Sequence, residues 1–179
     1  MNSMNLRNML ITAILFCLTI PCSESLLAQE SFTIYLVRHA EKSLEDKSDR
    51  NPELTDCGRQ RAESLAYFFE QVDIHDVYSS NYSRTISTAQ PVADSKNTKI
   101  QIFDPKQTES FAQILKQTGK NALVIGHSNS TPSLANALLQ QADAFPQIDE
   151  SEYNDILQIV FMGDQVQATV FKSNFRCRE

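Results

Sequence analysis

The chain has 179 residues, of which 41% are hydrophobic and 21% charged, and it contains four glycines. This composition excludes collagen-like, low-complexity and wholly disordered proteins, and the length predicts a single domain. With 16 lysines and arginines against 22 aspartates and glutamates, the formal net charge is −6. That balance argues against nucleic acid as a partner, because no excess of basic side chains is available to neutralise a row of phosphates.

The first thirty residues predict a targeting segment. An apolar run at residues 9–20 follows a single charged residue, Arg7. As a helix this run would span roughly 18 Å, which is too short to cross a bilayer but typical of a secretory signal. We expect cleavage after Ala28, which divides the chain into a signal peptide at residues 1–28 and a mature domain at residues 29–179. A cut after Ser25 is the competing site.

Two other interpretations of this segment stay open. Without cleavage, the apolar run would anchor the protein in a membrane, whereas cleavage would leave no part that inserts stably. Cys17 and Cys22 suggest a lipoprotein signal, but Phe16 and Pro21 precede them where a small residue is expected. A secretory signal predicts a periplasmic or secreted protein.

Export would leave two cysteines, Cys57 and Cys177, in an oxidising compartment. A disulfide can form there, although nothing in the sequence shows that the two side chains meet. Cleavage after Ala28 leaves 151 residues and the same net charge, and a chain of this length supports one hydrophobic core.

Apolar patterns divide the mature chain into alternating strands and helices. The first elements that we expect are a strand at 32–37 and a helix with an apolar stripe from Ala62 to Val72, for which Thr55 is the N-cap. Two weaker strands follow at 77–78 and 100–103, separated by a helix near Arg84. After them we expect a helix around Phe111, a strand at 122–125, and a helix over 133–141 that Thr131 and Pro132 open. Continuous Val- and Ile-rich runs suit strands that are buried on both faces, and hydroxyl caps and early prolines are typical of helix starts.

The C-terminal part predicts a hairpin. The runs at 156–162 and 165–171 flank Gly163-Asp164, a pair of turn-forming residues. The polar and acidic residues 142–154 predict a surface loop. Together these elements predict an α/β fold, a three-layer α/β/α sandwich with a mostly parallel central sheet and a C-terminal antiparallel hairpin.

Two histidines directly follow predicted strands. Arg38-His39 follows the first strand, and Gly126-His127 follows the strand at 122–125 and precedes a helix. Because ligand sites of α/β sheets lie beyond the carboxyl ends of the strands, and helix N-termini favour anions, we expect these side chains to converge with Arg84. The sequence therefore predicts a local positive pocket in an acidic protein.

The residues around this pocket form four ordered blocks. They are Leu36-Val37-Arg38-His39-Ala40, Leu54-Thr55 with Gly58 and Arg61-Ala62, Ser79-Ser80 with Arg84 and Thr88-Ala89, and Val124-Ile125-Gly126-His127-Ser128. In this order and spacing they resemble the histidine phosphatase superfamily, also called the phosphoglycerate mutase-like fold, in its small secreted or periplasmic form. The segments 38–42, 126–132 and 149–153 also resemble a subgroup of short bacterial members.

The resemblance implies a reaction and a role for each residue. A neutral His39 would attack phosphorus and form a phosphohistidine that water then hydrolyses. Arg38, Arg84 and His127 would hold the phosphoryl oxygens, and Lys42 would add a fifth positive contact to the two arginines and two histidines. The scheme requires no metal and no cofactor, and the expected partner is a small phosphorylated substrate.

This chain departs from the family pattern at two places. Ala40 stands where the family has glycine, which narrows the turn beside the nucleophile. The glutamate that protonates the leaving group in the mutase branch is missing with its Gly-rich stretch, and Ser128 replaces the aspartate of the phytase-like branch. Asp104 and Glu109 fall in the corresponding segment and are the candidate proton donors, with Glu41 also close to His39 in sequence. Small relatives that act on phosphohistidine dispense with this acid.

We therefore interpret the chain as an exported, metal-independent phosphatase that hydrolyses phosphate monoesters or phosphohistidine through His39. One alternative is a non-catalytic envelope module that binds phosphate or another anion. The other is a phosphoglycerate mutase-type phosphotransferase, which the short chain disfavours because it lacks the insertions that close over the site in larger members. The loops at 41–53, with Lys47 and Arg50, and at 142–154 would determine specificity, but their composition selects neither a substrate nor an oligomeric state.

Overall fold

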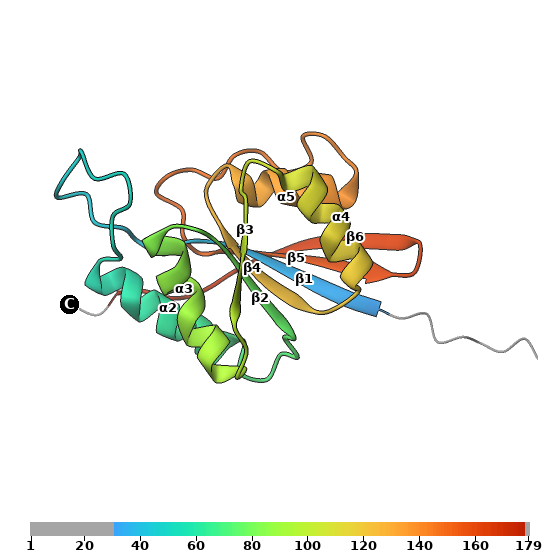
Figure 1. The fold of residues 1–179 in the computed structure, drawn as a ribbon, viewed down its shortest axis with the longest axis horizontal. Helices are drawn as coiled ribbons and strands as arrows, with labels where there is room; N and C mark the ends of the chain where they lie inside the picture. The colour runs from blue at the N-terminus through green and yellow to red at the C-terminus, as the bar shows by residue number, and fades with distance from the viewer. Residues whose placement is uncertain (1–30, 178–179) are drawn as a thin grey trace, which may run out of the picture.

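The computed structural model describes residues 31–177 as one sheet with helices on both faces (Figure 1). The elements are β1 (Ser31–Arg38), α2 (Asp56–Phe68), β2 (Asp76–Ser80), α3 (Ser83–Ser95), β3 (Ile100–Phe103), α4 (Thr108–Thr118), β4 (Ala122–Gly126), α5 (Ser130–Leu139), β5 (Asp155–Met162) and β6 (Gln165–Lys172). The predicted signal peptide and its cleavage site lie outside the described residues. Between residues 31 and 177, none of the helices has the length and apolar character needed to cross a membrane.

The sheet has six strands in the order β3-β2-β4-β1-β5-β6. β1, β2, β3 and β4 pair in parallel, whereas β5 pairs antiparallel to both β1 and β6. The mostly parallel sheet and the C-terminal hairpin are thus confirmed. Because β1 lies between β4 and β5, its carboxyl end reaches the middle of the sheet edge.

Helices cover both faces of the sheet, so the three-layer architecture is confirmed. Helices α2 and α3 pack against each other on one face, and α4 and α5 pack against each other on the opposite face. Alternate residues of β4 serve the two cores, with Leu123 and Ile125 packed toward α2 and α3 and Val124 packed toward α4 and α5. This alternation is the two-residue period of a strand that is buried on both sides.

The start of α2 is positioned against the chain that follows β1. Thr55 is the N-cap, as predicted, and its hydroxyl accepts a hydrogen bond from the Gly58 N–H at 3.0 Å. The Thr55 N–H in turn donates to the Glu41 carbonyl at 2.9 Å. A Cβ at Gly58 would lie 2.2 Å from that same carbonyl oxygen. Only glycine therefore allows α2 to approach the segment after the predicted nucleophile so closely.

Two helix boundaries differ from those predicted. Helix α5 begins at Ser130 with Asn129 as its N-cap, rather than with Thr131, because the Thr131 N–H already bonds to the His127 carbonyl at 3.0 Å. Pro132 lies within the first turn, where its missing N–H costs nothing. Helix α2 ends at Phe68, so Val72, at the end of the predicted apolar stripe, packs on the core from the following loop.

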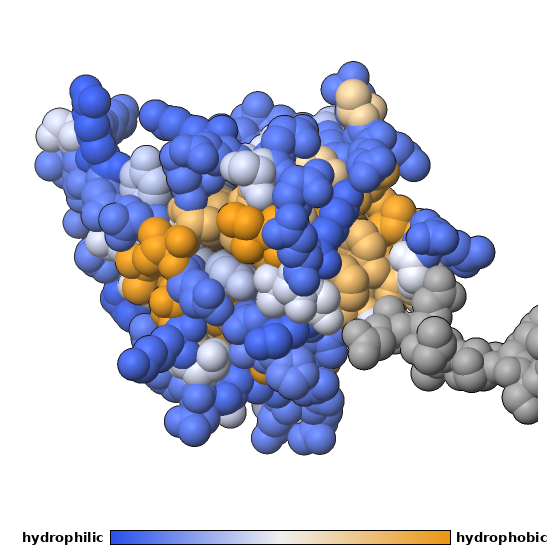
Figure 2. Space-filling model, turned by 45° about the vertical axis from the view of Figure 1, so that its right-hand side comes forward, coloured by the Kyte–Doolittle hydropathy of each residue, from blue (hydrophilic) through white to orange (hydrophobic). Residues whose placement is uncertain are grey.

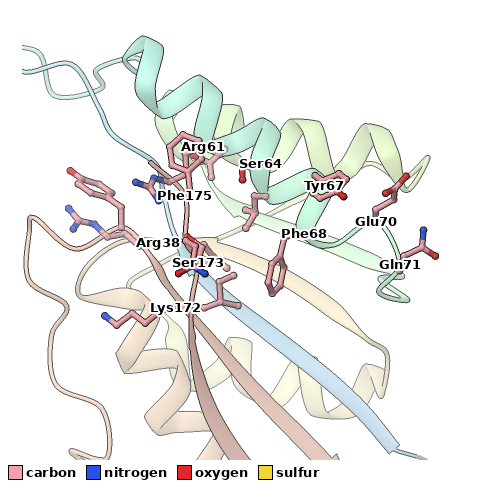
Figure 3. Close-up of a pocket in the computed structure, with 16 residues that line it drawn as sticks. Arg38, Arg61, Ser64, Tyr67, Phe68, Glu70, Gln71, Lys172, Ser173 and Phe175 are labelled. Atoms are coloured by element: carbon pink, nitrogen blue, oxygen red, sulfur yellow. The ribbon is translucent and has the colours of Figure 1, made fainter. Parts of the chain in front are cut away.

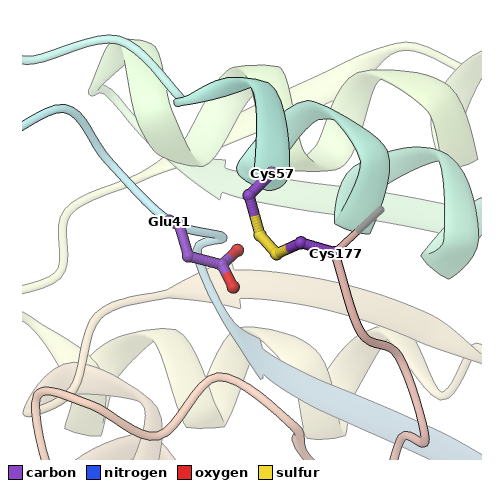
Figure 4. A group of neighbouring side chains, drawn as sticks. All are labelled: Glu41, Cys57 and Cys177. Atoms are coloured by element: carbon purple, nitrogen blue, oxygen red, sulfur yellow. A yellow bond between two sulfur atoms is a disulfide. The ribbon is translucent and has the colours of Figure 1, made fainter. Parts of the chain in front are cut away.

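Cys57 and Cys177 form a disulfide, which settles the pairing that the sequence left open (Figure 4). Cys57 lies in the first turn of α2, and Cys177 lies in the tail that follows β6. The same tail contacts α2 again where the Arg61 guanidinium lies 4.6 Å from the centre of the Phe175 ring. The Glu41 carboxylate lies beside the two sulfur atoms. The disulfide therefore fixes the C-terminal tail against the helix that supports the chain after His39.

The surface carries few large apolar side chains. Figure 2 shows a face on which hydrophilic residues predominate, with hydrophobic residues gathered in a band across the middle. The exposed large hydrophobic residues come from α2, β3, α4, β6 and the loop after β1; they are Leu44, Tyr67, Phe68, Ile102, Ile114, Val170 and Phe171. Single exposed apolar residues of this kind are common in folded proteins.

Candidate active site

A cavity of about 390 Å³ lies at the carboxyl edge of the sheet. Four of the predicted site residues line it, namely His39 and Lys42 after β1, Arg84 at the start of α3, and His127 after β4. The other lining residues are Tyr82, Pro105, Lys106, Ser128, Asn129, Gln147 and Glu150. The parallel strands thus bring together residues that are up to 88 positions apart in the sequence.

His39 is buried and held in one tautomer. Its side chain Nδ1 lies 2.7 Å from the Ala40 carbonyl oxygen. Because a carbonyl only accepts hydrogen bonds, Nδ1 carries the proton and Nε2 keeps its lone pair. Burial is the main cause that lowers the pKa of His39 to about 3, and Arg84 and His127 lower it further while the Ala40 carbonyl opposes them. The ring is therefore neutral at neutral pH, as a nitrogen nucleophile must be.

Ala40 links the nucleophile loop to α3. Its N–H donates to the Thr88 hydroxyl oxygen at 3.0 Å, and that hydroxyl donates to the Arg84 carbonyl at 2.7 Å. Ala40 is fully buried, so its methyl group is packed inside the protein. This chain of bonds fixes the backbone of Arg84 relative to His39.

His127 is also neutral, with its proton on the other nitrogen. Its Nε2 lies 2.8 Å from the Ser80 hydroxyl oxygen, and that hydroxyl donates to Thr85 Oγ1 at 3.0 Å. Ser80 therefore accepts the proton of His127 Nε2, and Nδ1 faces the Arg84 Nη2 at 3.5 Å without a proton of its own. Burial first, then Arg84, Lys42 and Arg38, lowers the pKa of His127 to about 4.

Arg84 has donors to spare. Its Nε and Nη1 atoms are buried and have no hydrogen-bond partner among the described residues. The guanidinium lies 4.5 Å from the centre of the Tyr82 ring, and its burial lowers the pKa of Arg84. Buried donors without partners are rare and costly. An anion in the cavity would supply the missing acceptors.

Arg38 has a different environment from the one predicted. Its Nη1 donates to the carbonyls of Asp149 and Glu152, each at 2.9 Å, and its Nη2 donates to the Glu150 carboxylate at 2.6 Å. The guanidinium also lies 4.3 Å from the centre of the Tyr153 ring. Arg38 is not among the described residues that line the 390 Å³ cavity. The structure therefore holds Arg38 behind the loop before β5, with the Glu150 carboxylate where a phosphoryl oxygen was expected.

A second cavity, of about 600 Å³, lies on the other side of Arg38, between α2 and the C-terminal tail (Figure 3). Arg61 lines it and forms an ion pair with Glu41 at 2.6 Å. Arg61 also donates to the Asn154 side chain at 2.8 Å. Glu41 is thus engaged by Arg61, although it is only two residues from His39.

The two candidate proton donors do not reach the active-site cavity. Asp104 is exposed, and its Oδ1 accepts a hydrogen bond from the Lys106 N–H at 2.9 Å. Glu109 is exposed in the first turn of α4, where an acid complements the helix dipole. Neither lines the cavity, so their positions do not support the role of leaving-group acid.

The acid that does line the cavity is Glu150, which was not among the predicted site residues. Its carboxylate accepts hydrogen bonds from the Ser128 hydroxyl and from Arg38. The Ser128 hydrogen bond is the main cause that lowers the pKa of Glu150, which is therefore ionised at neutral pH. The predicted sheet topology could have indicated Glu150. A strand that pairs antiparallel to β1 begins at the sheet edge where β1 ends, so the residues just before β5 lie beside the site.

One protein-family model matches a part of the chain that contains several of the cavity residues. The family model of the histidine phosphatase superfamily, branch 1, matches residues 34–107, which include His39 and Arg84. No curated protein matches the chain.

Several solved structures are similar, and the alignments include nearly the whole of each of those chains. The protein histidine phosphatase SixA complexed with tungstate is 19% identical, with a TM-score of 0.64, and the alignment covers 79% of this chain and 97% of that one. A mycobacterial glucosyl-3-phosphoglycerate phosphatase is 11% identical, with a TM-score of 0.62 and coverages of 80% and 99%. A phosphoserine phosphatase mutant from Entamoeba histolytica, in complex with phosphoserine, is 15% identical, with a TM-score of 0.64 and coverages of 79% and 97%.

At these identities the solved structures establish the fold, and the family model places residues 34–107 with the histidine phosphatase superfamily, branch 1. The fold and the matched segment together support a hydrolase of the phosphatase type.

Proposed function

We propose that this phosphatase hydrolyses phosphate monoesters or phosphohistidine through a phosphohistidine intermediate on His39. The observation that carries the proposal is the state of His39, a buried neutral imidazole whose proton is fixed on Nδ1 by the Ala40 carbonyl. Arg84, with two buried nitrogens that lack partners, lines the same cavity. A nucleophile and an unused cation are thus combined at one site.

In the first step, the lone pair of His39 Nε2 attacks phosphorus. The bond between phosphorus and the leaving group breaks, and its electron pair departs with the leaving group. Arg84 supplies planar donors to the phosphoryl oxygens, and Lys42 supplies a further positive charge. His127 donates to an oxygen once it binds a proton, which a phosphate dianion beside it favours.

In the second step, water attacks the phosphorus of the phosphohistidine. The phosphorus–nitrogen bond breaks, its electron pair returns to Nε2, and a proton of the water passes to solvent as inorganic phosphate leaves. Glu150, ionised at neutral pH, has no proton to give to a leaving group in the first step. General acid assistance is worth about 10²–10⁴-fold, so we expect aryl phosphates and phosphoramidates to react much faster than alkyl phosphates.

The test is phosphate release from p-nitrophenyl phosphate by the purified protein and by two histidine variants. His39→Ala should lower kcat by about 10³-fold or more, and it should abolish an acid-labile, alkali-stable phosphoenzyme trapped with a labelled donor. His75→Ala is the matched control, because His75 is exposed and pairs with Asp73 away from the cavity. Equal rates for His39→Ala and the unmodified protein would refute the mechanism.

Two further outcomes separate the alternatives. Binding of phosphate without any trapped phosphoenzyme would favour a non-catalytic anion-binding module. Exchange of the phosphoryl group between positions of 3-phosphoglycerate, without release of free phosphate, would favour a mutase. Release of free phosphate in both assays supports the phosphatase.

We propose in addition that the protein is exported to the periplasm or the medium after removal of residues 1–28. The apolar run at residues 9–20 supports this, and so does the Cys57–Cys177 disulfide, since disulfides persist in oxidising compartments. Mass spectrometry of the protein from a native fraction should find Gln29 at the N-terminus. An intact Met1 would contradict cleavage, and Leu26 at the N-terminus would support the competing cut after Ser25.

A further inference from the structure

The active-site cavity is larger and more positive than a phosphoryl group requires. A phosphoryl group has about the volume of three to four water molecules, or roughly 100 Å³, whereas the cavity measures about 390 Å³. Much of the space therefore belongs to the leaving group. The residues that line this remaining space should show what kind of leaving group it accepts.

The charges that line the cavity leave one cation in excess. Arg84, Lys42 and Lys106 are the cationic lining residues, and both histidines are neutral. The single lining carboxylate, Glu150, is engaged by Arg38 and Ser128. A phosphoryl group brings two negative charges, so three cations exceed it by one.

The two lysines occupy different parts of the cavity. Lys42 lies close enough to His127 and Glu150 to lower the pKa of both, which places its charge near the phosphoryl position. Lys106 follows β3, the edge strand of the sheet, and is not among the charges that lower the pKa of His127. Lys42 thus lies near His127 and Glu150, whereas Lys106 lines the cavity from the side of β3.

The side-chain ammonium of Lys106 has no partner in the part of the chain that the structure describes. It makes no hydrogen bond or ion pair with any residue between 31 and 177, whereas Lys96 and Lys172 are bound by carbonyls and carboxylates. Asn129 and Gln147 line the same cavity and offer amide groups. An acid on the leaving group would find a free cation and polar side chains here.

We propose that the substrate is a phosphorylated compound whose leaving group carries a second anionic group, a carboxylate or another phosphate, and that Lys106 binds this group. The inference rests on the proposed function, since it concerns the substrate class of the same site. It makes Lys106 a specificity residue and Lys42 a residue that serves the phosphoryl group of any substrate.

The test compares two substrates that differ by one carboxylate, phenyl phosphate and 3-carboxyphenyl phosphate. The unmodified protein should favour the carboxylated substrate in kcat/KM by about tenfold, the scale of one charge-assisted hydrogen bond. Lys106→Gln should reduce that ratio to near one, and Lys106→Arg should keep most of it. Lys42→Gln should lower kcat/KM for both substrates equally. Benzene-1,3-bisphosphate in the same assay distinguishes a carboxylate from a phosphate as the preferred second group.

Lys120→Gln is the matched control, because it removes the same charge from an exposed residue between α4 and β4 that does not line the cavity. It should leave both rates and their ratio unchanged. No preference for the carboxylated substrate in the unmodified protein, or a preference that survives in Lys106→Gln, would overturn the inference. Binding of phenylphosphonate and 3-carboxyphenylphosphonate, measured by calorimetry, gives the same ratio without turnover. Failure of catalysis and failure of the Lys106 assignment are therefore distinguished.

Discussion

Arg38 donates three hydrogen bonds to the loop before β5 and leaves only its Nε without a partner among the described residues, whereas Arg84, which lines the active-site cavity, makes no short hydrogen bond there and leaves two buried nitrogens without one. The first guanidinium joins β1 to residues 149–152 and closes one side of the site. The second is held in place by its backbone and by the Tyr82 ring, and its donors stay available. The same residue type thus holds a loop in one place and offers free donors to the cavity in the other, and the difference is visible only in what surrounds each side chain.

Among the substitutions considered, Arg84→Met should cause the largest loss of activity, because it removes the guanidinium that faces the cavity. We expect kcat/KM to fall by about 10³-fold or more, since the donors for the transferring phosphoryl group are lost. The free energy of unfolding should change by less than about 1 kcal/mol, because the substitution removes a desolvated charge and no short hydrogen bond. Steady-state kinetics and urea denaturation measure the two quantities. A destabilised variant with normal kinetics would contradict the comparison.

Arg38→Met should mainly lower the stability of the protein, because Arg38 holds the loop before β5. Two carbonyls and the Glu150 carboxylate would lose their donor. Because the Glu150 side chain is largely exposed, we expect a loss of about 2 kcal/mol, mainly from the two carbonyls. Activity should fall as well, because the loop that carries Glu150 loses its attachment. Urea denaturation checks the stability, with Arg59→Met as control, since Arg59 is an exposed surface arginine paired with Asp56. An unchanged free energy of unfolding would refute the structural role.

The pH dependence of stability sharpens the comparison. The pKa values of His39 and His127 are lowered to about 3 and about 4 from 6.5, so the unfolded chain binds more protons than the folded protein between these values. Stability should be complete above about pH 6.5 and should fall as the pH drops, with a slope of up to about 1.4 kcal/mol per pH unit for each histidine. In Arg84→Met the pKa of His127 should rise, because Arg84 is one of the charges that lower it. Denaturation curves across this range should then show a shallower fall for the variant; an identical slope would contradict the assignment.

The smallest effect is expected from Glu150→Gln. The amide still offers an oxygen to Arg38, so we expect a loss of only about 1 kcal/mol. Removal of a negative charge from the cavity should raise the affinity for inorganic phosphate a few-fold, measured by calorimetry. Glu152→Gln is the control, because that carboxylate binds Lys172 outside the cavity. Weaker phosphate binding in Glu150→Gln would mean that Glu150 orients the site rather than competing with the anion.

Much of the fold could be predicted because buried strands have a local signal. Continuous Val- and Ile-rich runs mark β1, β4 and β5, and the helical connections between β1, β2, β3 and β4 imply that these four strands pair in parallel. The end of a helix has a weaker signal. Residues 128–131 are Ser, Asn, Ser and Thr, all of which cap helices, so the choice of Asn129 depends on the turn that His127 makes rather than on its own identity.

The site could be predicted where a residue directly follows a strand. His39, Arg84 and His127 are placed by the backbone of their own elements, so their convergence follows from the topology. The environment of Arg38 depends on a loop more than a hundred positions away, where the bond partner Asp149 is 111 residues distant. No local pattern specifies such a contact. The same holds for the disulfide, whose cysteines are separated by 120 residues.

That disulfide also has a topological consequence. It closes the chain from Cys57 to Cys177 into a ring that contains β2 to β6, and thus Arg84 and His127. β1, which carries Arg38 and leads to His39, lies outside the ring on a free arm, yet in the native sheet it stands between β4 and β5, two strands of the ring. In the native sheet the ring therefore leaves a gap between β4 and β5 that the arm fills. The proposed nucleophile, His39, thus reaches the site from outside the ring, whereas Arg84 and His127 belong to it.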